Sequence, residues 1–377
     1  MTEFAALTGL SSSGKAPRRY LWTDAFAVCN FLGLYNQTGD HQYKHMALRL
    51  VDQVHNTLGR HRKDDLRTGW ISGGDEHEGK RHPTMGGLRI GKTMGERRPA
   101  DPFDEQLEWD RDGQYYHYLT KWMHALNRVS RVTRDPTYNT WAIELAKKAH
   151  DRFTYVTAHG EKLMYWKMSI DLSYPLVESM GQHDPLDGFI TYNQLQATAA
   201  QYSEKSTLLD LSAEIADMAA ICDGKNWVTD DPLGIGGLLS DAYRAAQLIV
   251  NGHFEQTDLP GILLDSSLAG LKSYARKNPL KLPADYRLAF RELGLSIGLL
   301  AVERLPELIE QNPGLPNKKG MLFSRVEGLM QYTQLSERIE RFWLDPANRE
   351  AESWTEHRDI NMVMLATALA PDGYLKL

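Results

Sequence analysis

The chain has 377 residues and a formal net charge of −6, a length that allows two or three ordinary domains or one large repetitive domain. The negative balance disfavours a general nucleic-acid-binding protein, because such proteins use surplus lysine and arginine to neutralise phosphates. Hydrophobic residues make up 42% of the sequence, which permits a large core and argues against global disorder. The absence of an apolar run of ~18 residues argues against a membrane span.

The first 18 residues lack a basic-then-apolar signal pattern, and we expect them to form a loose tail. The two cysteines, Cys29 and Cys222, lie in apolar helical stretches, which predicts buried thiols and no disulfide framework. Both features favour a cytoplasmic location. The sequence predicts no particular oligomeric state.

Hydrophobic periodicity predicts a series of helix pairs, because apolar residues recur at helical spacing and strand alternation is rare. In each pair, the first helix is apolar on nearly every side and the second has a polar stripe. The expected apolar helices are 20–35, 115–132, 188–202, 237–250, 286–305 and 359–370. The expected amphipathic helices are 41–58, 138–153, 207–222, 259–274 and 322–342.

Repeated units that cannot bury their apolar helices alone indicate a closed or stacked array. An open superhelix would expose its first and last apolar helices, 20–35 and 359–370, and neither carries an evident cap. We therefore expect residues 19–377 to form a single all-α domain, a toroid with inner and outer helix rings that closes between these two helices. The sequence offers no counterpart for a sixth outer helix.

The loops predict which face of this toroid is functional. Loops that return from an amphipathic helix to an apolar one are long, and the longest spans residues 59–114. If the inner helices are parallel, these loops gather at the helix N-termini, where unpaired N–H groups carry a partial positive charge. Long ordered loops commonly carry binding and chemistry, so we expect loop 59–114 to cover a site at this face.

The alternation of apolar and amphipathic helices over roughly residues 19–377 resembles the (α/α)6 toroid of the six-hairpin glycosidase-like superfamily. That superfamily includes relatives of N-acylglucosamine 2-epimerase. The resemblance lies in architecture and repeat rhythm, not in a signature motif, and no Arg-His motif of the epimerases maps onto this chain. It implies chemistry on carbohydrates, with site residues on the loops that precede inner helices.

Acids alternate with aromatic residues at the end of loop 59–114, in the stretch 103–112. Such a mixture suits a sugar, because an aromatic ring stacks on the sugar face and carboxylates bond hydroxyls or exchange protons. We take Glu105 and Asp110 as candidate catalytic acids, and Trp109, Trp70 and Arg89 as candidate substrate-binding residues. The alternative is structural, with acids that cap the next helix or pair with nearby arginines.

Further candidates lie at the N-terminal mouths of the apolar helices. Histidine titrates near neutral pH, so His117 and His357 are natural candidates for proton transfer, with Asp359 as a further catalytic candidate. The structural alternative is that these side chains bond within the ring or cap a helix. The candidate substrate-binding residues at the mouths are Trp22, Asp24, Tyr116, Asp187 and Glu356.

Two motifs fail as cofactor sites. His77 and His82 are five residues apart, so they would not share a helix face as the two histidines of a zinc box do. The glycine-rich run 86–91 lacks the spacing and the strand–helix setting of a dinucleotide-binding turn. We therefore expect no metal and no nucleotide cofactor.

The leading hypothesis is a carbohydrate-active enzyme similar to glycoside hydrolases, which acts on a sugar or oligosaccharide through carboxylate acid/base chemistry. Its two carboxyl groups would lie ~5–5.5 Å apart for retention or ~6.5–9.5 Å apart for inversion. The first alternative is a sugar 2-epimerase or isomerase with His117 and His357 as bases. The others are a toroid that binds a ligand without catalysis, and a cyclase or lyase with an apolar substrate.

Overall fold

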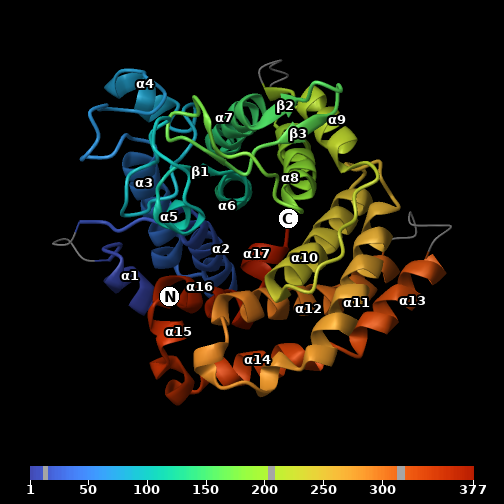
Figure 1. Cartoon of the computed structure of the whole chain (residues 1–377). Coiled ribbons are helices and arrows are strands. Elements are labelled where there is room, and N and C mark those ends of the chain that lie inside the picture. The colour runs from blue at the N-terminus through green and yellow to red at the C-terminus, as the bar shows by residue number, and fades with distance from the viewer. Residues whose placement is uncertain (12–15, 203–208, 312–318) are drawn as a thin grey trace. The chain divides into compact units, whose positions relative to one another are not determined.

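The protein is mostly α-helical with a few very short strands, as the computed structural model shows for residues 1–11, 16–202, 209–311 and 319–377 (Figure 1). This confirms the predicted all-α class. Backbone contacts divide the chain into two compact units, Thr2–Asp223 and Gly224–Leu377, called here the N-terminal unit and the C-terminal unit. Among the described residues, no helix is long and apolar enough to cross a membrane.

The N-terminal unit is built from three helical hairpins, α2 with α3, α6 with α7, and α8 with α9. The helix α6 packs between α2 and α8. The helices of this unit are α1 (Thr2–Leu7), α2 (Leu21–Thr38), α3 (His41–Leu58), α4 (Glu76–Arg81), α5 (Glu105–Asp110), α6 (Tyr116–Thr133), α7 (Pro136–Phe153), α8 (Asp184–Ala199) and α9 (Ser212–Cys222). The first two residues of the expected helix 207–222 lie outside the described residues.

The helices α6 and α8 run parallel, as a ladder of buried side-chain hydrogen bonds shows. Thr120 donates to Asp187, His124 bonds Gln194 at 3.1 Å, and Asn127 donates to Thr198 at 2.8 Å. Residue numbers rise together along both helices, so their N-termini lie at the same end. The ladder confirms for α6 and α8 the premise that these helices are parallel, so the loops that precede them approach the same end of the unit.

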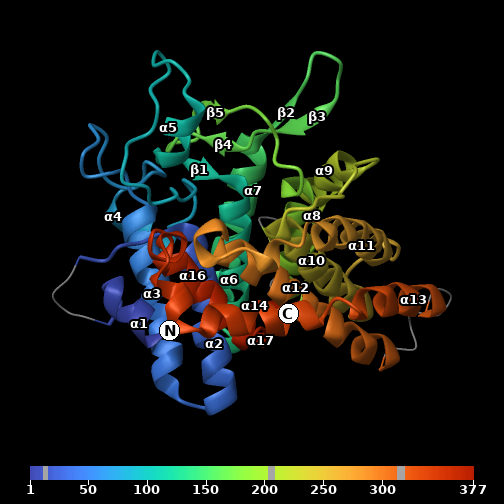
Figure 2. The same ribbon diagram turned by 60° about the horizontal axis from the view of Figure 1, so that its bottom comes forward.

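Two small sheets join the long loops of the N-terminal unit, and neither was expected from the sequence. The strands β1 (Gln114–Tyr115), β4 (Lys167–Met168) and β5 (Pro175–Val177) form one antiparallel sheet, and β2 (Thr154–Val156) pairs with β3 (Lys162–Met164). Figure 2 shows the first sheet and α5 together at one end of this unit. Because β1 directly precedes α6, this sheet lies at the N-terminal mouth of α6.

Loop 59–114 is ordered and anchored by buried apolar side chains, including Leu88 and Ile90. The carbonyl of Ile90 accepts the Leu21 N–H at the start of α2. Gly91 has φ +98°, and a Cβ there would lie 2.3 Å from the Arg19 carbonyl oxygen. Only glycine allows this close approach, which fixes the loop over the start of α2.

The first residues do not form a loose tail, which corrects the prediction for residues 1–18 outside the undescribed residues 12–15. Phe4 and Leu10 are buried on and after α1. The Arg19 guanidinium donates to the Thr8 carbonyl at 2.7 Å, and Gln53 of α3 donates to that of Gly9. Apolar side chains and these bonds hold the segment against the unit.

The C-terminal unit contains α10 (Pro232–Val250), α11 (Leu259–Lys277), α12 (Ala289–Glu310), α13 (Lys319–Met330), α14 (Gln334–Leu344), α15 (Glu352–Thr355), α16 (Arg358–Leu369) and α17 (Asp372–Leu375). The apolar helices α10 and α12 approach closely because glycines face each other. A Cβ at Gly236 would lie 2.0 Å from the Gly294 carbonyl oxygen, and one at Gly298 would lie 2.6 Å from the Gly236 Cα. Glycine therefore defines the main helix contact of this unit.

The expected helix 322–342 is instead two helices, α13 and α14, which is a further correction. The chain turns between them, where the Thr333 hydroxyl donates to the Met330 carbonyl and the Ser336 hydroxyl donates to that of Thr333. Such side chains compete with the helical backbone bonds and favour helix ends. Closure of the ring through α2 and α16 joins different units and stays a prediction.

Candidate active site at the mouth of α6

Aromatic rings gather around His117 in the first turn of α6. The His117 ring lies 5.3 Å from the Tyr115 ring, 4.8 Å from that of Tyr118 and 6.1 Å from that of Trp166, centroid to centroid. Pairing of β1 with β4 brings Trp166 to this place, and the Tyr116 N–H donates to the Trp166 carbonyl. The His117 side chain keeps 29% exposure, so its ring is enclosed by aromatic neighbours and still reachable from solvent.

A buried carboxylate lies beside the same imidazole. Asp184, the first residue of α8, places Oδ1 3.7 Å from His117 Nδ1. Asp184 is only 6% exposed, and both its Oδ2 and His117 Nδ1 are buried without a hydrogen-bond partner in the described parts of the chain. A carboxylate next to an imidazole can orient the ring and stabilise its protonated form during proton transfer.

A buried ion pair between Lys167 and Glu108 lies next to the aromatic rings. The Lys167 ammonium, fully buried, donates to the Glu108 carboxylate at 2.9 Å and to the Glu108 and Arg111 carbonyls. Burial lowers the pKa of Lys167, and the Glu108 carboxylate opposes this effect. Arg97 donates to the other carboxylate oxygen of Glu108 at 3.1 Å. These bonds fix α5 against the sheet.

This support leaves Trp109 at the surface. Its ring packs against the edge of Trp166 with centroids 5.0 Å apart, and 48% of the residue is exposed. A rigid exposed indole beside the His117 cluster offers a face on which a sugar ring can stack. Among the predicted substrate-binding residues of this unit, Trp109 therefore lies with the candidate catalytic His117.

Several other predicted polar residues bond within the N-terminal unit. Asp24 is buried, accepts the Tyr20 N–H at 3.0 Å and lies 3.4 Å from the Arg19 guanidinium. Arg89 donates to Asp112 at 2.9 Å and to two backbone carbonyls. Lys121 and Thr120 both donate to Asp187. With their polar atoms engaged in this way, we leave Asp24, Arg89 and Asp187 out of the proposed site.

Three predicted aromatic residues belong to the core. Trp22 packs on Phe26 with centroids 4.6 Å apart, the Trp70 indole N–H donates to Glu76 at 3.2 Å, and the Tyr116 hydroxyl donates to Tyr192 at 2.9 Å. All three are buried. Loop 59–114 therefore contributes Trp109 to the His117 cluster, while Trp70 anchors the loop itself.

The predicted catalytic acids Glu105 and Asp110 lie at the two ends of α5, and both are exposed. They flank the helix that carries Trp109. The intervening Glu108 takes the structural role that the sequence left open, through its pair with Arg97. Asp112 is also structural, because it is buried and bonds Arg89 and the Gly91 N–H.

The C-terminal unit carries the second predicted mouth. His357 is the residue before α16, and its ring lies 5.5 Å from Phe290 in an edge-on contact. Glu356 is exposed, whereas Asp359 is half-buried. His117 and His357 belong to different units, so their joint action as the two bases of an epimerase stays a prediction.

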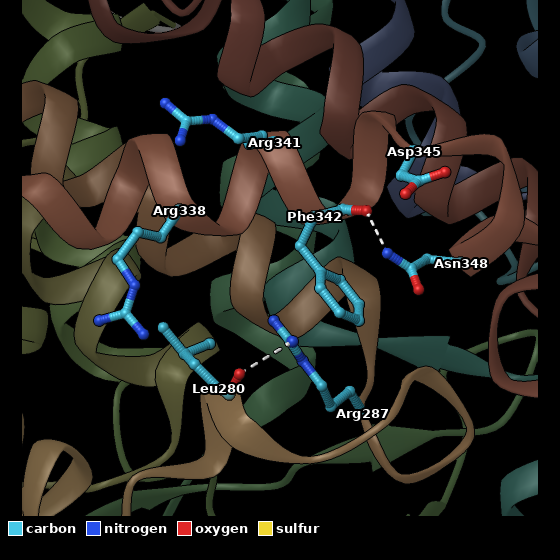
Figure 3. Close-up of a pocket in the computed structure, with 7 residues that line it drawn as sticks. All are labelled: Leu280, Arg287, Arg338, Arg341, Phe342, Asp345 and Asn348. Atoms are coloured by element: carbon cyan, nitrogen blue, oxygen red, sulfur yellow. Dashed lines mark hydrogen bonds between the residues drawn. The ribbon is translucent and has the colours of Figure 1, made fainter.

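A groove beside α14, with a cavity volume of about 350 Å³, was not anticipated from the sequence (Figure 3). The Arg287 guanidinium stacks on Phe342 at 3.6 Å and forms a bidentate pair with buried Glu292, which also accepts the Trp343 indole N–H. The Arg341 guanidinium pairs with Glu337. The lining residues are Leu280, Arg287, Arg338, Arg341, Phe342, Asp345 and Asn348.

Sequence reasoning missed Asp184 and Trp166. Asp184 carried one signal, an acid before a proline at a helix start, which is also the pattern of a simple capping residue. Trp166 reaches the cluster through strands of two residues, which are too short for alternation to reveal. In the described parts of the chain, no group of three or more His, Cys, Asp or Glu side chains is placed to hold a metal ion.

No family model matches this sequence. No curated protein matches it either. The fold is similar to a solved structure described as a sugar epimerase from a ruminal bacterium, with a TM-score of 0.47 and 9% identity over 93% of this chain and 87% of that one.

Proposed function

We propose that this protein is a sugar-processing enzyme in which His117 transfers a proton next to the sugar carbonyl, as an epimerase or isomerase does. The observation that carries the proposal is the His117 imidazole, partly exposed within a cluster of aromatic rings and next to a buried carboxylate. Aromatic rings favour a ligand with apolar C–H faces, and imidazole is the side chain best suited to exchange a proton near neutral pH.

In this proposal, the open-chain sugar lies against Trp109 and Trp166 with its carbonyl toward the mouth of α6. His117 Nε2 takes the proton from the carbon next to the carbonyl, which gives an enediolate. A proton from solvent, added to the opposite face of that carbon, inverts it. Return of the His117 proton to the former carbonyl carbon, with the hydroxyl proton passing to the former carbonyl oxygen, isomerises the sugar. Backbone N–H groups at the start of α6 favour the negative oxygen that forms.

Glycoside hydrolysis is the second candidate, and the exposed carboxylates of Glu105 and Asp110 favour it, because they flank Trp109 on α5. One carboxyl group would protonate the leaving oxygen, and another would act as nucleophile or activate water. In this reading, His117 is a binding residue. We further propose a sugar as the physiological partner, with neither nucleic acid nor membrane involved, and a cytoplasmic location.

Incubation of the protein with a sugar panel in D2O distinguishes these functions. The panel consists of glucose, mannose, galactose, N-acetylglucosamine, cellobiose, maltose and lactose. Deuterium at the carbon next to the carbonyl, detected by NMR, indicates the proposed reaction, whereas new reducing ends indicate hydrolysis. Thermal stabilisation with neither product indicates a binding protein. If deuterium incorporation, new reducing ends and thermal stabilisation are all absent, the proposal of a sugar-processing enzyme is overturned. The cyclase or lyase alternative then remains.

His117→Gln tests the role of the imidazole within the same experiment. We expect deuterium incorporation to fall at least ~100-fold, the usual contribution of a general base. The matched control is His77→Gln, because His77 is well exposed and lies outside the cluster. Equal incorporation by His117→Gln and the wild type would remove His117 from the mechanism.

A further inference from the structure

We infer that Asp184 is a positioning residue, which holds His117 in the tautomer protonated at Nδ1 and leaves Nε2 bare for proton transfer. The catalytic part of this inference rests on the proposed function, whereas the tautomer itself does not. No expectation from the sequence included Asp184. The inference follows from helix register, burial and the space left by one glycine.

Helix register places the two residues together. Thr120 donates to Asp187 across α6 and α8, and His117 and Asp184 each lie three residues earlier on their own helix. Because the helices are parallel, the His117–Asp184 pair lies one turn closer to the N-termini than the Thr120–Asp187 bond. The ladder of buried hydrogen bonds farther along the helices keeps this alignment in place.

Burial gives the carboxylate few alternatives to this partner. The polar atoms His117 Nδ1 and Asp184 Oδ2 are both buried, and neither has a hydrogen-bond partner among the described residues. A buried polar atom without a partner loses its hydration and gains no hydrogen bond in return, which is unfavourable. A proton on Nδ1 would let this nitrogen donate to the Asp184 carboxylate, whose nearer oxygen is Oδ1.

The separation of 3.7 Å between Nδ1 and Oδ1 is longer than a hydrogen bond. Catalytic hydrogen bonds are often long without substrate and shorten when substrate binds. We therefore expect the Nδ1–H tautomer to prevail before substrate binds and the bond to shorten in the complex.

Gly181 leaves the space that the carboxylate occupies. A Cβ at Gly181 would lie 2.5 Å from both Cγ and Oδ2 of Asp184. Asp184 has a short side chain that cannot retreat from such a contact without leaving His117. The loop before α8 thus accommodates the carboxylate in its present position beside the imidazole.

The test reads the tautomer directly by NMR. The full chain is labelled with ¹⁵N-histidine, and two-bond nitrogen–proton correlations of His117 are recorded where the imidazole is neutral. The His117→Gln variant assigns the signals. We expect the wild type to show Nδ1–H, and Asp184→Asn to show Nε2–H, because the asparagine amide donates to Nδ1. Glu178→Gln, which alters an exposed carboxylate before α8, should leave the tautomer unchanged.

Asp184→Glu retains a carboxylate acceptor and should restore the Nδ1–H tautomer, which separates positioning from a purely structural role. It also keeps the test decisive if Asp184→Asn does not fold. Nε2–H in the wild type, or Nδ1–H in folded Asp184→Asn, would overturn the inference. With an exchangeable sugar, Asp184→Asn should lower kcat at least ~100-fold with little change in KM.

Failure of the proposed function and failure of the inference about Asp184 give different results. A tautomer switch in Asp184→Asn, combined with no sugar exchange by the wild type, would sustain the pair and overturn the proposed function. Sugar exchange that depends on His117 but is unchanged in Asp184→Asn would sustain the proposed function and overturn the role of Asp184.

Discussion

The two mouths that carry predicted histidines are built very differently. Around His117, two long loops add a small sheet, the helix α5 and a buried carboxylate, so that aromatic rings enclose the imidazole. Around His357, the preceding segments form short helical turns, and the ring contacts Phe290 edge-on. The helices therefore supply similar mouths, while the loops determine which mouth acquires the groups for chemistry.

The contacts that stabilise the two units differ as well. The N-terminal unit holds its site on buried polar contacts, the Lys167–Glu108 pair and the α6–α8 ladder, whereas the C-terminal unit depends on glycine contacts between α10 and α12. Buried charges are costly when one partner is lost, and close backbone contacts are intolerant of added atoms. Substitutions can therefore break each support separately.

The largest expected effect is in the N-terminal unit. Lys167→Met leaves the buried Glu108 carboxylate without its ammonium partner, which should lower the free energy of unfolding by about 3–5 kcal/mol. Urea denaturation measures the change. The exposed control Lys63→Met should stay within about 0.5 kcal/mol of the wild type. A small loss in Lys167→Met would show that Arg97 alone compensates Glu108.

The corresponding break in the C-terminal unit is Gly236→Ala. Its Cβ would meet the Gly294 carbonyl oxygen at 2.0 Å, so the helices must separate, and we expect a loss of about 1–3 kcal/mol. The adjacent Gly237 has no atom within 4 Å of an added Cβ. Gly237→Ala should therefore stabilise the protein by about 0.5–1 kcal/mol. Equal effects in the two variants would contradict the glycine contact.

A buried histidine should make the N-terminal unit sensitive to acid. Burial lowers the pKa of His55 to about 3, and its Nε2 accepts the Trp122 indole N–H. Below pH ~6.5, His55 becomes protonated in the unfolded chain but stays neutral in the folded chain. The free energy of unfolding should therefore fall as the pH drops from ~6.5 toward 3. His55 contributes up to ~1.4 kcal/mol per pH unit to this fall.

Urea titrations of the wild type and His55→Gln at pH 7, 5.5 and 4.5 measure this dependence. The variant should be less stable at pH 7 but lose less stability on acidification. If the free energy of unfolding depends on pH equally in the wild type and in His55→Gln, His55 is not the source of the pH dependence.

The smallest expected effect sharpens the role of the exposed indole. The ligand is the sugar of the panel that incorporates deuterium fastest. Trp109→Ala should weaken its binding about fivefold to tenfold, as expected for one lost stacking contact. Calorimetric titration measures the affinity. Leu107→Ala, on the same helix and also exposed, is the control and should bind as the wild type does. Equal weakening in both variants would indicate a general disturbance of α5.

The sequence predicted the helices best where their ends carry strong signals. The helix 41–58 has the predicted bounds, because Asp40 caps its start and Gly59 ends it. The short-range patterns of 207–222 and 322–342 were less informative. Hydroxyl side chains around Thr333 divide the second of these into α13 and α14, a competition that hydrophobic periodicity does not register.

The candidate site was predictable only in part. His117 and Trp109 follow from residue type and position before an apolar helix. Asp184 depends on the register between α6 and α8, and Trp166 depends on the pairing of β1 with β4. These are long-range relations that no local pattern contains. Asp24 and Arg89 resembled site residues in sequence, but their polar atoms bond within the unit.

The D2O exchange experiment, carried out on variants of both histidines, measures at which mouth the proton is removed. If the proton is removed at the mouth of α6, His117→Gln should lose at least ~100-fold in deuterium incorporation. His357→Gln, in contrast, should retain the rate within about tenfold, because its ring lacks the enclosing cluster. Circular dichroism should show both variants folded like the wild type. Loss of exchange in His357→Gln with near-wild-type exchange in His117→Gln would contradict the account and move the chemistry to the C-terminal unit.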